Sequence, residues 1–156
     1  MSIREASDDA FAALVAGHAP ADLQLPDGPV ECREVLEMLR GLAQSIRPYF
    51  VPAGWLIVDG DEIVGLASLV RQPGDAGIDI GFGIAPTRRR RGFATAAVRN
   101  ILEWARADDR VVAVRGESAI NNPASQRVFE RNGFVRTGQR VDPEDGPVIR
   151  WEIVTG

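Results

Sequence analysis

The sequence predicts a mixed α/β domain in which helices flank a central sheet. Three observations support this prediction. Apolar residues recur with helical spacing between Pro29 and Arg47 and again between Gly92 and Asp108. Short apolar runs bounded by Asp, Gly or Pro lie between and after these two segments, which is typical of strands. The length of 156 residues suits a single domain over 1–156, and no stretch has the composition of a linker.

The first fifty residues are predicted to be mainly helical. Asp8 to Val15 is a short, Ala-rich helix candidate, and Ala19 to Gly28 contains enough Pro and Gly to form a loop. Pro29 to Arg47 has apolar residues at i, i+3, i+4 and i+7, so we expect an amphipathic helix. Cys32 belongs to this stripe and is expected to be a small core residue. No clear strand precedes the first helix.

The middle of the chain changes to strand patterns. The apolar runs Trp55 to Val58 and Ile63 to Val70 flank Asp59-Gly60-Asp61, which is a strong β-hairpin signal. A turn containing Pro and Gly, Gln72 to Gly77, leads into a third strand over Ile78 to Ile84. Three consecutive strands are therefore expected.

Helices and strands alternate in the rest of the chain. The helix over Gly92 to Asp108 buries its small and branched apolar residues. Asn122 and Pro123 begin the next helix, since Asn caps well and Pro is favoured at the first helical position. Gly133 ends this helix. The remaining strands are predicted at Val111 to Val114, Phe134 to Val141 and Val148 to Val154.

Composition and charge exclude several classes of function. All 18 basic residues are arginine, so neither a P-loop nor Schiff-base lysine chemistry is available. One cysteine and one histidine, His18, exclude an internal disulfide and a His-rich metal site. The net charge of −4 argues against a nucleic-acid partner. No apolar run approaches the roughly 20 residues of a membrane helix. We expect no metal, no nucleic-acid or membrane partner, and a cytoplasmic setting.

The most informative segment follows the strand over Ile78 to Ile84. Four consecutive arginines, Arg88 to Arg91, precede Gly92, which begins a helix. The free N–H groups and the dipole of a helix N-terminus favour a phosphate, and arginine adds bidentate contacts. A solvated charged loop explains the same residues, so the segment alone leaves both interpretations open.

Two blocks of the sequence resemble the GNAT family of N-acetyltransferases. Arg89-Arg90-Arg91-Gly92-Phe93-Ala94 is similar to the family signature Arg/Gln-x-x-Gly-x-Gly/Ala. Asn122 to Phe134 is similar to the Asn-x-x-Ser…Gly-Phe block of the branch that contains ribosomal-protein acetyltransferases. The resemblance implies an α/β GNAT fold, with a mixed sheet of about six to seven strands, splayed between the fourth and fifth, and about four helices.

The resemblance also implies an activity. The protein would transfer an acetyl group from acetyl-coenzyme A to a primary amine of a small molecule or of a peptide or protein N-terminus. The amides of Arg90 to Thr95 would hold the pyrophosphate. The strand from Asp79 to Ala85 would bulge and splay, exposing a backbone edge for the pantetheine arm, which Asn122 would also reach. The cofactor-binding residues so implied are Phe82, Gly83, Ile84, Arg89, Arg90, Arg91, Gly92, Phe93, Ala94, Thr95 and Asn122.

Candidate catalytic groups come from the same comparison. An alkylammonium group with a pKa near roughly 10 must lose a proton before it can attack, and Asp79 and Glu117 are the candidate bases. Phe129 stands where many family members have a proton-donating tyrosine, so we expect it to be a packing residue. Either Ser125 is then the substitute donor for the departing thiolate, or the thiolate leaves without a donor. Because of Phe129, a non-catalytic acyl-coenzyme A-binding module is the alternative function. The acceptor and the oligomeric state, a homodimer included, stay open.

Overall fold

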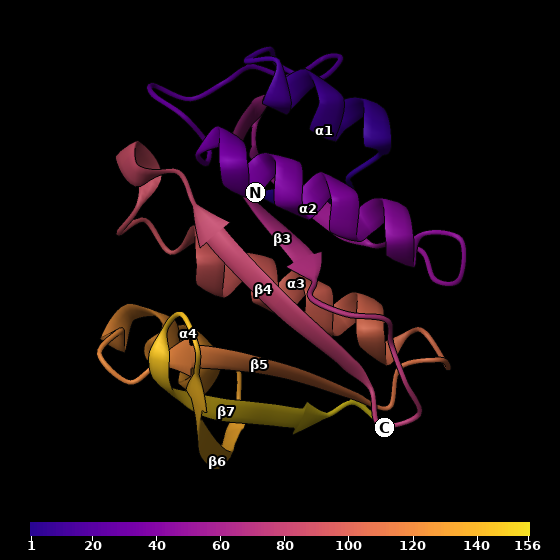
Figure 1. Cartoon of the computed structure of the whole chain (residues 1–156), viewed down its shortest axis with the longest axis vertical. Helices are drawn as coiled ribbons and strands as arrows, with labels where there is room; N and C mark the ends of the chain where they lie inside the picture. Colours follow the sequence, from indigo (N-terminus) through magenta and orange to yellow (C-terminus); the bar gives the residue numbers. More distant parts are fainter.

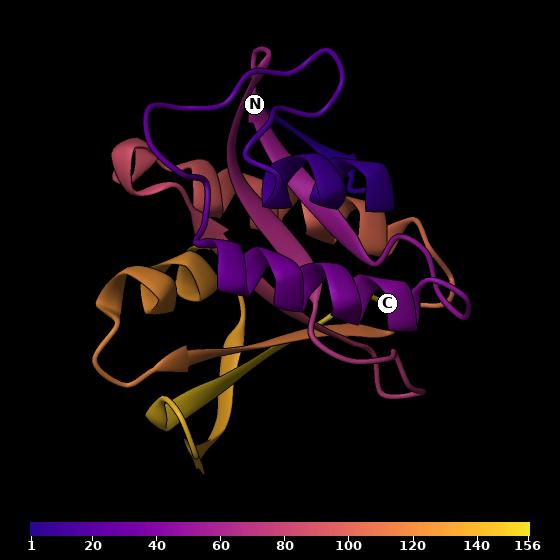
Figure 2. The ribbon, with the colours of Figure 1, turned by 45° about the horizontal axis from the view of Figure 1, so that its top comes forward.

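A seven-stranded sheet in the order β1-β2-β3-β4-β5-β7-β6 forms the centre of the computed structural model, which describes residues 1–156 (Figure 1). Helices α1 and α2 cover one face of this sheet, and α3 and α4 cover the other (Figure 1 and Figure 2). The strands are β1 (Ser2–Glu5), β2 (Gly54–Asp59), β3 (Glu62–Leu69), β4 (Ile78–Ile84), β5 (Ala113–Ala119), β6 (Val135–Asp142) and β7 (Gly146–Val154). The helices are α1 (Asp8–Val15), α2 (Arg33–Ile46), α3 (Phe93–Arg106) and α4 (Pro123–Arg131), with a 3-10 turn at Pro86–Arg88.

Strand β1 is the element that the sequence did not predict. It pairs antiparallel with β2, from Ser2 opposite Val58 to Glu5 opposite Trp55. Its four residues contain a single branched apolar side chain, Ile3, so they show no alternating pattern. Pairing with β2, not local propensity, therefore makes this segment a strand.

The expectation that Cys32 is a core residue is wrong. Helix α2 begins at Arg33, later than predicted, and Cys32 is its exposed N-cap. The rest of the apolar stripe is confirmed, since Leu36, Ala43 and Ile46 are buried. No helix combines the length and the apolar character that crossing a membrane requires.

The sheet divides where β4 meets β5. Strand β4 pairs with β3 in continuous register over Ile80–Ile84. It pairs in parallel with β5 only at Ile78, Asp79 and Ile80. Beyond Ile80 the two strands diverge (Figure 1), so the β5-facing backbone edge of 81–84 has no strand partner. The splay between the fourth and fifth strands is confirmed. The expected bulge in β4 is absent, because its register against β3 does not shift.

Aromatic packing fills the α4 side of this division. Phe129 of α4 is fully buried, and its ring stacks on Trp151 of β7 with centroids 5.7 Å apart. The centroid of the same ring lies 5.6 Å from the ring centroid of Phe82 of β4. Beneath it is Gly116 of β5, where a Cβ atom would lie 2.5 Å from Phe129 Cζ. Phe129 is thus the packing residue that the sequence predicted, and it needs a glycine at 116.

This contact predicts that Gly116→Ala destabilises the protein. The added methyl group has no room because the ring of Phe129 is confined on both sides, and overpacking of this kind costs about 1–3 kcal/mol. Urea unfolding of the two proteins measures the difference in the free energy of unfolding. Gly138→Ala is the matched control, since a Cβ atom added to this β6 glycine would meet nothing within 4 Å. Equal stabilities for the two variants would contradict the account.

Candidate active site

A pocket of about 380 Å³ opens on the α3 and α4 face of the sheet, beside the divided strands. We call it the α3-side pocket. Its lining combines the end of β4, the loop before α3 and the first turns of α4. The lining residues are Phe82, Gly83, Ile84, Arg89, Arg90, Ala94, Asn122, Ala124, Ser125 and Val128. Most residues that the sequence assigned to cofactor binding therefore lie around one pocket, together with Ser125.

The other assigned residues form the loop and first turn of α3 that adjoin this pocket. Gly92 is the N-cap of α3 with a φ of 78°, and no side chain caps the helix. Arg90 also has a positive φ of 65°. The first backbone hydrogen bond into the helix runs from the Ala96 N–H to the Gly92 carbonyl. The N–H groups of 93–95 therefore have no helical acceptor, which favours an anion at this position.

The four arginines of the loop differ in their contacts. Arg88 donates to both carboxylate oxygens of Glu62, lies 3.5 Å from Asp27, and keeps only 13% of its side chain exposed. This pairing lowers the pKa of Glu62. Arg89 donates to the Ile84 carbonyl at 3.2 Å, whereas Arg90 and Arg91 are exposed and unpaired. Arg88 thus anchors the loop to β3 and leaves the following three available to a ligand.

The start of α4 supplies polar groups to the α3-side pocket. The side-chain oxygen of Asn122 accepts a hydrogen bond from the Ser125 N–H at 3.2 Å, so Asn122 is the helix cap that its neighbour Pro123 suggests. Its amide NH₂ makes no hydrogen bond to the protein, and Asn122 lines the pocket. The Ser125 hydroxyl is half-buried and makes no hydrogen bond to the protein, so it is available as a donor.

A second, smaller pocket of about 160 Å³ lies on the other face of the same strand, beneath α2. We call it the α2-side pocket. Phe82 and Gly83 line both pockets, so the two meet at the segment of β4 whose β5-facing edge lacks a strand partner. Gly81 and Gly83 place no side chain on the α2 face, which leaves this stretch of backbone bare. The lining residues are Val30, Glu31, Val35, Leu39, Leu66, Ser68, Val70, Gly81, Phe82 and Gly83.

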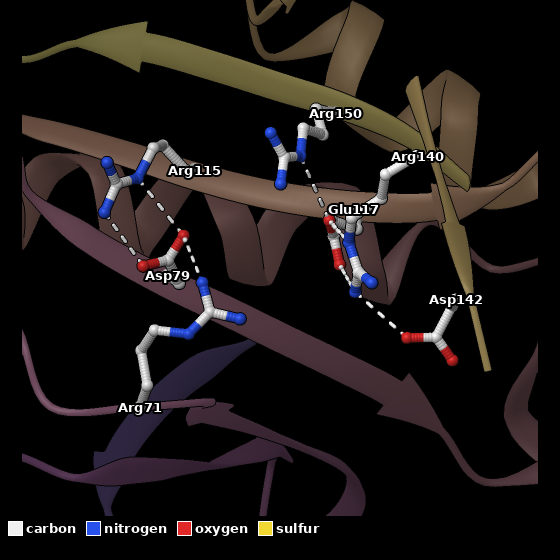
Figure 3. A network of polar contacts seen from close by, with 7 residues as sticks. All are labelled: Arg71, Asp79, Arg115, Glu117, Arg140, Asp142 and Arg150. Carbon is white, nitrogen blue, oxygen red and sulfur yellow. Dashed lines mark hydrogen bonds and ion pairs between the residues drawn. The ribbon is translucent and has the colours of Figure 1, made fainter. Parts of the chain in front are cut away.

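The two candidate bases lie elsewhere on the α2 face, in a polar cleft of about 570 Å³ (Figure 3). Asp79 accepts two hydrogen bonds from Arg115, at 3.1 and 2.9 Å, and lies 3.5 Å from Arg71. These contacts join β4 to β5 where the strands still pair. Neither Asp79 nor Glu117 lines the pocket that contains Ser125.

Glu117 has a similar set of partners. Arg140 donates to both of its oxygens, at 2.7 and 2.6 Å, and Arg150 lies 3.5 Å away (Figure 3). The hydrogen bonds from Arg140 hold the pKa of the Glu117 carboxyl below its usual range. Arg140 belongs to β6 and reaches Glu117 on β5 across the intervening β7. The contacts of Glu117 with Arg140 and Arg150 therefore link β5, β6 and β7 and reduce the basicity of Glu117.

Glu31 is the site residue that sequence reasoning missed. It belongs to the loop before α2, where no periodicity or motif marks it, and only the fold brings it against β4. The structure contains no group of three or more histidine, cysteine or acidic side chains that could hold a metal ion.

Comparison with known proteins establishes the class to which this fold and these pockets belong. The family model described as the acetyltransferase (GNAT) domain matches residues 2–135. The chain therefore belongs to the GNAT acetyltransferase family, which confirms the resemblance carried by the two sequence blocks.

Individual relatives agree with this assignment. The uncharacterized N-acetyltransferase YjdG of Bacillus subtilis (strain 168) is 32% identical over 84 residues, which are 52% of this chain and 50% of that protein. The chain thus spans about half the length of this curated relative.

Solved structures share the fold. RimL, a ribosomal alpha-N-protein acetyltransferase in complex with coenzyme A, superposes with a TM-score of 0.71 at 19% identity, covering 97% of this chain and 92% of that one. A variant of the spermidine N-acetyltransferase SpeG from Vibrio cholerae gives 0.71 at 17% identity, covering 99% and 95%.

Proposed function

We propose that the protein transfers an acetyl group from acetyl-coenzyme A to a primary amine. The observation that carries this proposal is the meeting of two pockets at Phe82 and Gly83, on the stretch of β4 whose β5-facing edge has no strand partner. A donor on the α3 side and an acceptor on the α2 side would come together at this stretch of backbone. Membership of the GNAT family supports the same reaction. Acetyl-coenzyme A, when bound, would supply the acetyl group as an activated thioester.

The α3-side pocket fits the chemistry of coenzyme A. The unpaired N–H groups of 93–95 and the exposed guanidinium groups of Arg89 to Arg91 suit a pyrophosphate. The free backbone edge of Phe82 to Ile84 suits an extended arm that contains amides, because strand-like pairing satisfies both partners. A backbone N–H on this edge would polarise a thioester carbonyl. The Asn122 amide and the Ser125 hydroxyl are placed for the arm and for the departing sulfur, respectively.

The ion pairs of the polar cleft suggest positioning roles for Asp79 and Glu117. Either carboxylate must release an arginine before it can take a proton. Glu117, with its lowered pKa, is in addition a weak proton acceptor. We propose that these pairs fix β4, β5 and β6 around the acceptor side. The ammonium group of the acceptor first releases a proton to water; the neutral amine then forms the C–N bond as the thioester C–S bond breaks, and a second amine proton ends on the departing thiol. Positioning and thioester polarisation provide most of the catalysis.

A direct assay tests the function. Incubation with acetyl-coenzyme A and a panel of primary amines should release free thiol in an amine-dependent manner. Binding of coenzyme A by calorimetry without turnover of any amine would instead support the acyl-coenzyme A-binding module, which the tyrosine-to-phenylalanine difference at Phe129 favours. Absence of both binding and turnover would refute both functions.

Gly92→Glu should weaken coenzyme A binding by at least about tenfold, equivalent to about 1.4 kcal/mol. The new carboxylate repels phosphate at the N-terminus of α3, and a left-handed φ of 78° strains any side chain there. Calorimetry measures the affinity, and thermal unfolding checks that the variant is folded. Gly41→Glu adds the same charge on α2, where a Cβ meets nothing within 4 Å, and should bind normally. Wild-type affinity in folded Gly92→Glu would contradict the loop assignment.

Glu117→Gln should lower the transfer rate at neutral pH by less than the roughly 10²-fold that marks the loss of a general base. The reason is that Arg140 and Arg150 already hold this carboxylate. Rates at saturating acetyl-coenzyme A, measured over a range of pH, provide the test, with Asp79→Asn as the matched comparison. A larger loss that shrinks as pH rises would identify the substituted residue as the base.

A further inference from the structure

Glu31 holds its carboxylate over the bare backbone where the two pockets meet. A Cβ atom built on Gly83 would lie 3.9 Å from Oε2 of Glu31. The other oxygen, Oε1, accepts a hydrogen bond from the Cys32 N–H at 2.8 Å, which orients the carboxylate. Glu31 is half-buried and lines the α2-side pocket. One oxygen is thus anchored, and the other faces the groove.

This carboxylate differs from the other two acidic groups near the divided strands. Asp79 and Glu117 each have two arginines within 4 Å, whereas Glu31 forms no ion pair. No arginine lines the α2-side pocket. Glu31 is therefore the acidic group at this junction whose charge is free for a cationic ligand.

The remainder of the groove is almost entirely apolar. Its second polar side chain is Ser68 of β3, which is only 5% exposed and whose hydroxyl makes no hydrogen bond to the rest of the groove. The other side chains of the lining are Val30, Val35, Leu39, Leu66 and Val70. An ammonium group needs hydrogen-bond acceptors, and Glu31 and Ser68 provide them, while the apolar walls suit a hydrocarbon chain.

We propose that Glu31 binds the ammonium group of the acceptor and that the apolar groove takes its carbon chain. The substrate class is a primary monoamine on a short apolar chain. The volume of about 160 Å³ is below the roughly 300 Å³ of ordinary ligand pockets, which limits the length of the chain. This inference rests on the proposed function and specifies its acceptor.

The neighbouring polar cleft disfavours a polyamine. A second ammonium group, extending from the α2-side pocket, would reach the region of Arg71, Arg115 and Arg150. These arginines repel it, and the carboxylates of Asp79 and Glu117 are already paired with them. Monoamines are therefore preferred over polyamines.

Binding of n-butylammonium to the protein without coenzyme A tests the inference independently of acetyl transfer. Nuclear magnetic resonance titration should give saturable binding to the wild type and an affinity about tenfold lower for Glu31→Gln, because a charge-assisted hydrogen bond is lost. Glutamine keeps an acceptor for the Cys32 N–H, so the loop is preserved. Glu34→Gln, an exposed acidic residue in the first turn of α2, is the matched control and should bind as the wild type does.

Two other ligands separate the contributions of charge and chain. Affinity for 1-butanol, which has the same chain without the charge, should be the same in the wild type and Glu31→Gln. Spermidine should bind more weakly than n-butylammonium. Absence of saturable n-butylammonium binding, equal binding by Glu31→Gln, or tighter binding of spermidine overturns the inference.

Kinetics distinguish this inference from the proposed function. With acetyl-coenzyme A present, Glu31→Gln should raise the KM for n-butylamine while the affinity for coenzyme A stays unchanged. If no amine is acetylated but Glu31-dependent binding persists, the proposed function fails and the amine site stands. If the wild type acetylates amines and Glu31→Gln leaves KM unchanged, the amine site fails and the function stands.

Discussion

The contact between Phe129 and Gly116 occupies the position on which the architecture of both pockets depends. The ring lies over the bare backbone of Gly116, which is the last position at which β5 still pairs with β4. It contacts Phe82 of β4 on one side and Trp151 of β7 on the other. One side chain of α4 therefore packs against both halves of the sheet. Beyond it, β4 continues paired with β3 but not with β5, and its free edge is where the α3-side and α2-side pockets meet.

This chain contains no lysine, so arginine is its only basic side chain apart from the single histidine. The neighbours of each guanidinium group determine what that arginine does. Arg88 anchors the loop before α3 by pairing with Glu62, although it stands in the same run as three exposed arginines. Arg115 and Arg140 pair with Asp79 and Glu117 and connect strands of the polar cleft (Figure 3). These pairs also decide which acidic groups are free. A carboxylate that is paired with arginine is a poorer base and a poorer cation ligand. Glu31, which forms no ion pair, is therefore the better cation ligand where the two pockets meet.

The two pockets differ in the charge of the ligand that each one favours. Anion-binding features, namely a helix N-terminus without a side-chain cap and exposed guanidinium groups, gather on the α3 side. A single unpaired carboxylate within apolar walls lies on the α2 side. The two faces therefore favour ligands of opposite charge, as a reaction between a phosphate-bearing donor and an ammonium-bearing acceptor requires.

The sequence by itself determined the features whose causes are local. The hairpin around Gly60, the Asn122 cap and the arginine–glycine loop were predictable because their signals lie within a few residues of one another. The tertiary structure alone decided β1, the exposure of Cys32 and the ion pairs of Asp79 and Glu117. Arg115 lies 36 residues from Asp79, and Arg140 lies 23 residues from Glu117. The position of Glu31 against Gly83 was likewise decided by packing of the loop before α2 on β4. Periodicity and capping act along the chain, whereas pairing between distant charges and strands depends on how the whole fold closes.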